Sequence, residues 1–348
     1  MDEPFRVIQW ATGPIGSTMV RTMLRKRSVE VVGAIVHSRE KVGRDLGELV
    51  GMSKVGITAS DDADEVLKTA ADVVMIATPA ALMNKGSWNE NVEQISKALK
   101  AKKNVITVSG FIYPWKYCPE IAQQLDCLAK ENGVSLLGTG LNPGFLFDYL
   151  TVVLSGCLAR VDRIIMRHCE DETEYDSLPI MRDMLGFGRS PEEYEKRHFR
   201  RLLDYQTALF AECAHFIADS VGWELTELKP KLEVFTAKEP LQISCMRIDP
   251  GTVCAYRFVL QGLKEKDIAI SIEFSGVVCP DKVKDVGEPG QTIWFEGLPT
   301  YGVELKGNLL TMGFLSTAAH AVNAIPRVIE APPGLVSLKD LPVVVPIR

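Results

Sequence analysis

The sequence lacks the features that mark membrane proteins and nucleic-acid binders. None of its apolar runs approaches the length of about 18 residues that a membrane-spanning helix needs, and the longest are strand-sized. It has no dense stripe of lysine and arginine, and its formal net charge is −6. Acidic residues precede a strand-like segment at the N-terminus, where a signal peptide would be basic and then apolar. We therefore predict a cytoplasmic protein that binds neither membranes nor nucleic acid, and 348 residues are enough for two domains.

The cysteines also lack a recognisable pattern. The eight of them form no C-x-x-C pair and do not cluster with the five histidines. Several stand inside apolar patterns, for example Cys157 in segment 152–158. We predict that they are small buried side chains in a reducing compartment and that the chain has no metal site.

The first 37 residues have the pattern of a dinucleotide-binding β-α-β unit. An apolar run ends at a glycine-containing turn, a helix is expected to begin near Ile15, and a second apolar run occupies 31–36. Glycines let the backbone approach a pyrophosphate, and the helix presents unpaired N–H groups to that anion. Alanine replaces the first glycine of the G-x-G-x-x-G pattern, which the turn tolerates if Ala11 keeps a negative φ. A purely structural turn is the alternative, but the position after a strand and before a helix favours a nicotinamide dinucleotide site. The predicted contacts here are Thr12, Gly13, Pro14, Ile15 and Gly16.

The end of the second strand indicates which dinucleotide binds. An acidic residue there would bind the ribose hydroxyls of NAD, whereas a basic neighbourhood accommodates the 2′-phosphate of NADP. His37, Ser38 and Arg39 stand at this point, and the planar fork of Arg39 can pair with a phosphate. We predict NADP as the cofactor. Glu40 keeps NAD possible, and an ordinary solvated turn is the remaining alternative.

Alternating strand and helix patterns continue to about residue 140. Strands are predicted at 71–78, 104–109 and 134–138, with helices at 90–102 and 119–132 between them. This order predicts an α/β fold with a doubly wound parallel sheet, in which ligands bind at the carboxyl ends of the strands. The residues near those ends, and therefore predicted to bind the cofactor, are Ala77, Thr78, Pro79, Ser109, Asn142 and Pro143.

The pattern changes after about residue 150. Ser190 and Pro191, with Glu193 behind them, are typical of a capped helix start, and the helix is predicted to end near Gly222. Six strand-like segments follow, which predict an antiparallel sheet over helices that forms one wall of a cleft. They are 231–236, 243–248, 252–260, 268–276, 292–296 and 302–305. A last helix is predicted at about 315–324, before Pro326.

Several segments together resemble one family, the 2,4-diaminopentanoate dehydrogenases and native amine dehydrogenases of the wider dihydrodipicolinate reductase-like group. The matching segments occur in family order over nearly the whole chain. They are 7–13 (Val-Ile-Gln-Trp-Ala-Thr-Gly), 41–48, 113–115 (Tyr-Pro-Trp), 138–145 (Gly-Thr-Gly-Leu-Asn-Pro-Gly-Phe), 175–177, 186–188 and 322–326 (Val-Asn-Ala-Ile-Pro).

The resemblance implies an organisation and a reaction. It implies a homodimer whose chains have a Rossmann domain at 1–145, an α+β substrate and dimerisation domain at 146–308, and a C-terminal helix and tail at 309–348 that return to the Rossmann domain. It implies that NAD(P)H delivers a hydride to an imine formed from a ketone or aldehyde and ammonia, with oxidative deamination as the reverse. It places Asn142 and Pro143 beside the nicotinamide and brings Asn323 to the cofactor domain.

The chain departs from the family at one position. In amine-forming members the strand before Tyr-Pro-Trp ends in a glutamate pair that handles ammonia and the imine proton, whereas this chain has Ser109 and Gly110 there. A serine hydroxyl cannot act as a carboxylate base at neutral pH. Hydride transfer is not affected by this change. The chain could therefore reduce a preformed imine, recruit another acid, reduce a carbonyl without ammonia, or bind NADPH as a regulatory protein without turnover.

Because the cofactor carries the hydride, the chain must supply or accept a proton at the heteroatom of a small carbonyl, imine or amine substrate. Tyr175 is the first candidate, since a phenol can donate to a developing alkoxide or amine; a packed tyrosine with a capped hydroxyl is the alternative. Ser109 could orient the substrate or only bind the cofactor. His168, after the strand pattern 161–166, could relay a proton if it faces the cleft. The acidic run 170–174 could attract a cationic amine, although such runs are more often solvated loops.

Overall fold

The computed structural model describes residues 3–79, 87–309 and 312–348. Contacts between residues divide the chain into two units. Unit 1 is Met1–Tyr149 with Met312–Arg348, and unit 2 is Leu150–Thr311. Within the described residues, no helix combines the length and the apolar character needed to cross a membrane.

Unit 1 contains a seven-stranded sheet in which every strand pair is parallel. The order is β15-β6-β5-β4-β1-β2-β3, with β1 at Phe5–Trp10, β2 at Val29–Ile35, β3 at Ala59–Ser60, β4 at Val73–Ile76, β5 at Asn104–Thr107, β6 at Ser135–Gly138 and β15 at Gly334–Val336. The central strands are continuous apolar runs because helices cover both faces of the sheet. All four residues of β4, for example, are buried.

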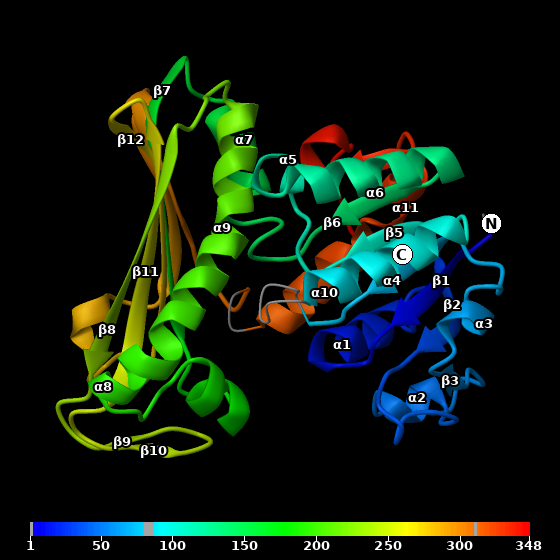
Figure 1. The fold of residues 1–348 in the computed structure, drawn as a ribbon, viewed down its shortest axis with the longest axis horizontal. Coiled ribbons are helices and arrows are strands. Elements are labelled where there is room, and N and C mark those ends of the chain that lie inside the picture. Colours follow the sequence, from blue (N-terminus) through cyan, green and yellow to red (C-terminus); the bar gives the residue numbers. More distant parts are fainter. Residues whose placement is uncertain (1–2, 80–86, 310–311) are drawn as a thin grey trace. The chain divides into compact units, whose positions relative to one another are not determined.

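The helices of unit 1 form a layer on each face of the sheet (Figure 1). Their bounds are α1 Pro14–Met23, α2 Leu46–Leu49, α3 Ala63–Val66, α4 Ser87–Lys100, α5 Pro114–Tyr117, α6 Pro119–Asn132, α10 Gly313–Asn323 and α11 Ile325–Ile329, with a 3₁₀ turn at Leu338–Asp340. One apolar core joins α1, α10 and α11 to the sheet, and the other joins α4 and α6. The predicted doubly wound fold is confirmed, and so is the return of the last helix, because Ala318 and Val322 share a core with Met19 and Val20.

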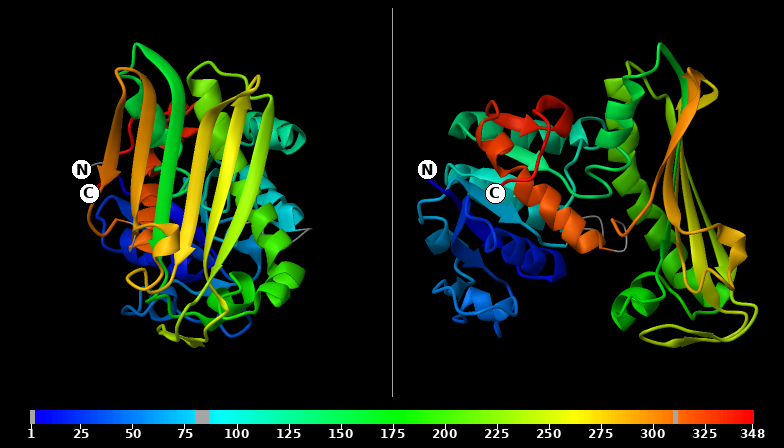
Figure 2. Two further views of the ribbon diagram at one scale, coloured as in Figure 1. Left: turned by 90° about the vertical axis from the view of Figure 1, so that its left-hand side faces the viewer. Right: turned by 180° about the vertical axis from the view of Figure 1, so that it is seen from behind.

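Unit 2 contains a six-stranded sheet of order β14-β13-β7-β12-β11-β8, seen face-on in the left view of Figure 2. Its strands are β7 Arg160–Asp171, β8 Glu227–Thr236, β11 Val253–Lys264, β12 Asp267–Val277, β13 Gly290–Leu298 and β14 Tyr301–Leu305, with a separate hairpin of β9 Leu241–Gln242 and β10 Arg247–Ile248. The remaining elements are α7 Tyr149–Ser155, α8 Pro191–Tyr194, α9 Arg200–Ser220, π-helical turns at Pro179–Met184 and Glu195–Phe199, and a 3₁₀ turn at Lys284–Val286.

Helix α9 covers one face of this sheet through aromatic contacts (Figure 1). The ring centroid of Phe210 lies 5.9 Å from that of Phe258 on β11 and 5.3 Å from that of Phe274 on β12. Ser190 caps the preceding turn by accepting a hydrogen bond from the backbone of Glu193. The start of this helical region therefore lies where the sequence pattern indicates.

Three predictions about unit 2 are wrong in detail. The sheet is mixed rather than antiparallel, because β7 runs parallel to β12. Segment 243–248 is not a straight strand: the backbone N–H of Ile243 donates to Met246, which closes a turn between β9 and β10. His168 does not follow a strand but lies inside β7, which extends to Asp171.

The cysteines are less uniformly buried than their sequence context suggests. Cys169, Cys213 and Cys254 are buried, but Cys127 on α6 and Cys157 after α7 are exposed. Cys157 stands where the short α7 has ended, so the apolar pattern around it no longer corresponds to a buried helix face. Within the ranges given above, no group of three or more His, Cys, Asp and Glu side chains is placed to hold a metal ion.

Candidate functional site

The glycine turn joins β1 to α1 and leaves the helix N-terminus open. No side chain caps α1, and Pro14 occupies its first turn. A Cβ on Gly16 would lie 2.2 Å from the carbonyl oxygen of Ala11, whereas a Cβ on Gly13 would have nothing within 4 Å. Gly16 is therefore needed for the turn itself, and Gly13 leaves free space in front of the helix. The hydroxyl oxygen of Thr12 is buried without a hydrogen-bond partner in the described part of the chain. An uncapped helix start of this kind is suited to a diphosphate.

Ala11 does not keep a negative φ; its φ is 73°, so this prediction is wrong. The backbone N–H of Ala11 donates to the carbonyl of Ile35 at 2.8 Å, and the amide of Gln9 donates to the carbonyl of Ala11 at 3.0 Å. These bonds hold the alanine in the left-handed region, which disfavours a residue with a Cβ by about 1–2 kcal/mol.

The Ala11→Gly variant is therefore expected to be more stable than the wild type. Glycine makes the unfolded chain more flexible, which costs roughly 0.4–1 kcal/mol of stability, but relief of the left-handed strain exceeds this cost. We therefore expect the free energy of unfolding to rise by about 0.5–1 kcal/mol. Urea unfolding followed by circular dichroism measures it. Ala34→Gly in β2 is the control and should be destabilising. A loss of stability in Ala11→Gly would show that the backbone of Ala11 is not strained.

The turn after β2 carries the residues predicted to select the cofactor. His37 and Arg39 are exposed and Ser38 is half-buried. The indole N–H of Trp10 donates to Nε2 of His37 at 3.2 Å. Lys41, not predicted as a site residue, donates from Nζ to the carbonyl of Thr12 at 3.0 Å. This contact brings a positive charge to the glycine turn. In the sequence, Lys41 was marked only by its place in the basic cluster after β2.

The ends of β4 and β5 are linked by a buried hydrogen-bond network. The Ser109 hydroxyl donates to the carbonyl of Thr78 at 2.7 Å, and the Thr78 hydroxyl donates to Gln94 at 2.8 Å and accepts from Asn91 at 2.9 Å. The single hydroxyl proton of Ser109 is therefore committed to the backbone, which favours a positioning role. Ala77 is half-buried and Pro79 is exposed at the same strand end.

A second cluster follows β6 in unit 1. Both polar atoms of the Asn142 amide are buried without a hydrogen-bond partner among the described residues, next to Pro143 in the chain. The Thr139 hydroxyl lies 3.0 Å from Nδ1 of His320, and the ring of Phe145 lies 5.0 Å from that imidazole. Burial lowers the pKa of His320 to about 4, so this ring is neutral at physiological pH. The Asn323 amide oxygen accepts from the backbone of Ile347, a bond that favours a structural role for Asn323.

The proton-donor candidates Tyr175 and His168 both lie in unit 2. His168 is buried on β7, with Nδ1 2.9 Å from the amide oxygen of Gln291 and its ring stacked on Phe274 at 4.7 Å. Tyr175 is half-buried, and its pKa is raised by burial and by Glu172. Its phenol therefore stays protonated at neutral pH.

The acidic run is not simply a solvated loop. Glu172 has only 7% of its surface exposed, whereas Asp171 and Glu174 are exposed. Burial, followed by the charges of Glu170 and Asp171, raises the pKa of Glu172 to about 8. Glu172 belongs to the acidic run noted in the sequence, but its burial depends on contacts that local composition does not show.

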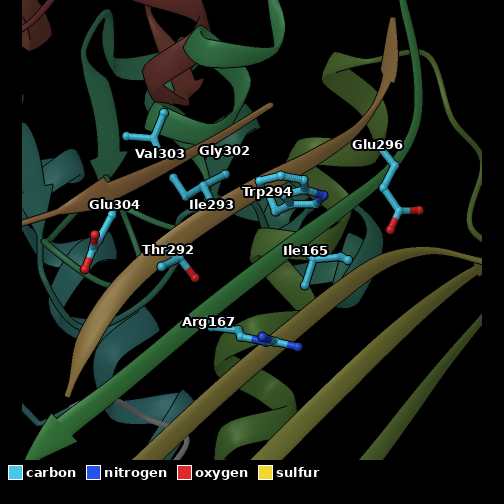
Figure 3. Close-up of a pocket in the computed structure, with 9 residues that line it drawn as sticks. All are labelled: Ile165, Arg167, Thr292, Ile293, Trp294, Glu296, Gly302, Val303 and Glu304. Atoms are coloured by element: carbon cyan, nitrogen blue, oxygen red, sulfur yellow. The ribbon is translucent and has the colours of Figure 1, made fainter. Parts of the chain in front are cut away.

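A separate pocket of about 480 Å³ lies on the open face of the sheet in unit 2 (Figure 3). Ile165 and Arg167 alternate along β7 with Ile164 and Met166, which are fully buried, so the pocket occupies the opposite face. Trp294 is 46% exposed there. None of the predicted site residues is among the described residues that line this pocket.

A Rossmann sheet with an open glycine turn, joined in one chain to an α+β unit, defines an NAD(P)-dependent oxidoreductase. The model of the 2,4-diaminopentanoate dehydrogenase C-terminal domain matches residues 145–348, and the model of the dihydrodipicolinate reductase N-terminus matches residues 7–110. The chain belongs to the 2,4-diaminopentanoate dehydrogenase family, and the resemblance noted from its sequence is confirmed.

Known proteins of this family match nearly the whole chain. A 2,4-diaminopentanoate dehydrogenase of Acetoanaerobium sticklandii is 28% identical over 98% of this chain and 94% of its own length. An amine dehydrogenase of Streptomyces virginiae is 26% identical over 96% and 95%. The solved structure of an amine dehydrogenase from Mycobacterium smegmatis superimposes with a TM-score of 0.79 at 26% identity, covering 98% of this chain and 97% of that one.

Proposed function

We propose that the protein transfers a hydride between NADP and the carbon of a C=N bond in a small substrate. In one direction a ketone or aldehyde, ammonium and NADPH give the amine, NADP⁺ and water; in the other the amine is oxidatively deaminated. The observation that carries this proposal is the match over nearly the whole chain to two dehydrogenases, one of them named for amines in general.

The residues of unit 1 fit a nicotinamide dinucleotide. The open space at Gly13 and the uncapped start of α1 would receive the diphosphate, with Lys41 adding a positive charge. Arg39 would pair with the 2′-phosphate of NADP. The unpaired Asn142 amide offers the donor and the acceptor that a carboxamide requires. When bound, the cofactor supplies or accepts the hydride, and the chain positions it.

The proton at nitrogen has to come from the protein or from water. Ser109 and Gly110 replace the carboxylates, and the Ser109 hydroxyl is bonded to the backbone of Thr78. We assign the donor role to Tyr175, because its phenol carries a proton at neutral pH. The second candidate function, reduction of a C=O bond without ammonia, is favoured by the same absence of a carboxylate at Ser109.

Oxidation of NADPH with a panel of small ketones and aldehydes, with and without excess ammonium, tests the proposal. We expect oxidation that depends on ammonium, with the amine as product identified by mass spectrometry. NADP⁺ reduction by the same amine is the matched reverse assay. Oxidation that is indifferent to ammonium and yields the alcohol would establish the carbonyl reductase instead. Tight NADPH binding with no turnover in either assay would indicate a regulatory protein that binds NADPH without catalysis.

We also propose that the protein is a cytoplasmic homodimer. The exposed side chain of Trp294 and the apolar Ile165 and Val303 form a face on the open side of the unit 2 sheet that a second copy could cover (Figure 3).

A further inference from the structure

The acidic segment at the end of β7 contains one carboxylate without a partner. Asp171 accepts hydrogen bonds from a neighbouring threonine, and Glu174 accepts one from a serine hydroxyl at 3.1 Å. Glu170 lies 3.6 Å from the ring nitrogen of His168. Glu172 is buried, and among the residues that the structure describes its side chain makes no hydrogen bond or ion pair.

Glu172 lines a cavity of about 550 Å³ within unit 2. Its backbone N–H donates to the carbonyl of Val277 at 2.8 Å, which fixes the residue beside the end of β12. Among the described residues that line this cavity, the single cationic side chain is that of Lys306, and its Nζ lies 3.4 Å from a carboxylate oxygen of Glu304. No cation in the lining is therefore left to neutralise Glu172.

The charges around the cavity favour a cation. A buried carboxylate without a partner is destabilised, and it responds by holding its proton. That response is seen here, since burial and the charges of Glu170 and Asp171 raise the pKa of Glu172 to about 8. A positive group placed against the carboxylate would remove the penalty, whereas an anion would increase it.

Two phenol rings accompany the carboxylate. Tyr175 lines the same cavity, and Tyr256 on β11 is fully buried. After burial, the charge of Glu172 contributes to raising the pKa of both phenols. A carboxylate and an aromatic ring in the lining of one cavity suit an ammonium group, because the ring face attracts a cation.

We propose that this cavity binds the ammonium group of a primary amine or of free ammonia, with Glu172 as its carboxylate partner. The residues of this site belong to unit 2, whereas Ser109 and Gly110 belong to unit 1. The proposal rests on the amine chemistry of the proposed function for its biological meaning, but the binding itself is measured without any hydride transfer.

The proposal predicts how binding depends on pH. The ammonium must meet an ionised Glu172, and a carboxyl with a pKa of about 8 is roughly one tenth ionised at about pH 7 and nine tenths ionised at about pH 9. Alkylamines, like the lysine side chain, stay protonated over this range. Affinity should therefore rise about tenfold from about pH 7 to about pH 9, and binding at neutral pH should release a proton. The other titratable groups near Glu172 are Cys169, Glu170, Asp171, Glu174, Tyr175, Tyr256, Glu304 and Lys306.

Calorimetric titration of the full-length protein with isopropylammonium chloride and with ammonium chloride tests the site. Isopropanol serves as the neutral control ligand. Repeating the titration in buffers of different ionisation enthalpy reports the released proton. Glu172→Gln keeps the shape of the side chain and removes its charge, and we expect it to weaken binding of the amine by at least about tenfold and to abolish the rise with pH. The control variant Glu227→Gln removes an exposed carboxylate of unit 2 that is not among the residues lining this cavity, and it should bind as the wild type does.

Three results would overturn the proposal. They are wild-type affinity for the amine that is constant from about pH 7 to about pH 9, binding in Glu172→Gln equal to that of the wild type, or isopropanol binding as tightly as isopropylammonium. The first and third results are measured on the wild type, so the proposal can still be tested if Glu172→Gln misfolds. Because turnover is not measured, loss of the proposed hydride transfer and loss of this amine site are distinguishable.

Discussion

Replacing Gly13 with alanine is expected to weaken the binding of both NADPH and NADH by at least about tenfold while the stability of the chain stays unchanged. A methyl group at this position meets nothing within 4 Å, and the backbone φ of −70° suits alanine. The methyl group would instead occupy the space in front of the uncapped α1, where the diphosphate has to approach the backbone. Cofactor fluorescence titration measures the affinity, and thermal unfolding measures the stability.

Gly16→Ala is the matched variant and should behave in the opposite way. Its methyl group would lie 2.2 Å from the carbonyl oxygen of Ala11, so the backbone of the turn must move. We expect a loss of about 3 kcal/mol in the free energy of unfolding, at the upper end of what overpacking produces. If Gly13→Ala lost as much stability, or bound both cofactors as the wild type does, the open space at Gly13 would not be the diphosphate site.

The features that local sequence determines were predicted well. The strands of unit 1 are buried on both faces and therefore appear as apolar runs, and Gly13, Pro14 and Gly16 mark the turn into α1. The backbone of Ala11 was predicted wrongly because its φ is set by a hydrogen bond to Ile35, a residue on another strand. An alanine at that position contains no local sign of the left-handed conformation.

The candidate site in unit 2 shows where local patterns are insufficient. Five residues of an acidic run are typical of a solvated loop, and Asp171 and Glu174 are indeed exposed. Glu172 is buried because its backbone pairs with Val277 at the end of β12 and because the ends of β13 and β14 contribute to the same cavity. These contacts join residues more than 100 positions apart. The parallel pairing of β7 with β12 is equally non-local, since an alternating pattern does not specify the direction of a neighbour.

Local sequence predicts that a cofactor binds better than it predicts which cofactor binds. The β-α-β unit and the glycine turn are specified by local sequence and identify a dinucleotide site. We expect selection between NAD and NADP to depend on a few exposed side chains after β2, which make few contacts that local sequence could reveal. Arg39 and Lys41 belong to one basic cluster in the sequence. In the structure Arg39 is exposed, whereas Lys41 donates a hydrogen bond to the carbonyl of Thr12.

Arg39→Ala is expected to weaken NADPH binding by about tenfold or more and to change NADH binding by less than about twofold. Arg39 is exposed and forms no ion pair with the residues that the structure describes, so its guanidinium is available to a 2′-phosphate. Lys41→Ala should weaken both cofactors to the same extent, because the ammonium lies 3.0 Å from the carbonyl of Thr12 in the glycine turn that both cofactors share. Equal losses for NADPH and NADH in Arg39→Ala would remove the assignment of NADP and direct attention to Glu40 as a partner for the ribose of NAD.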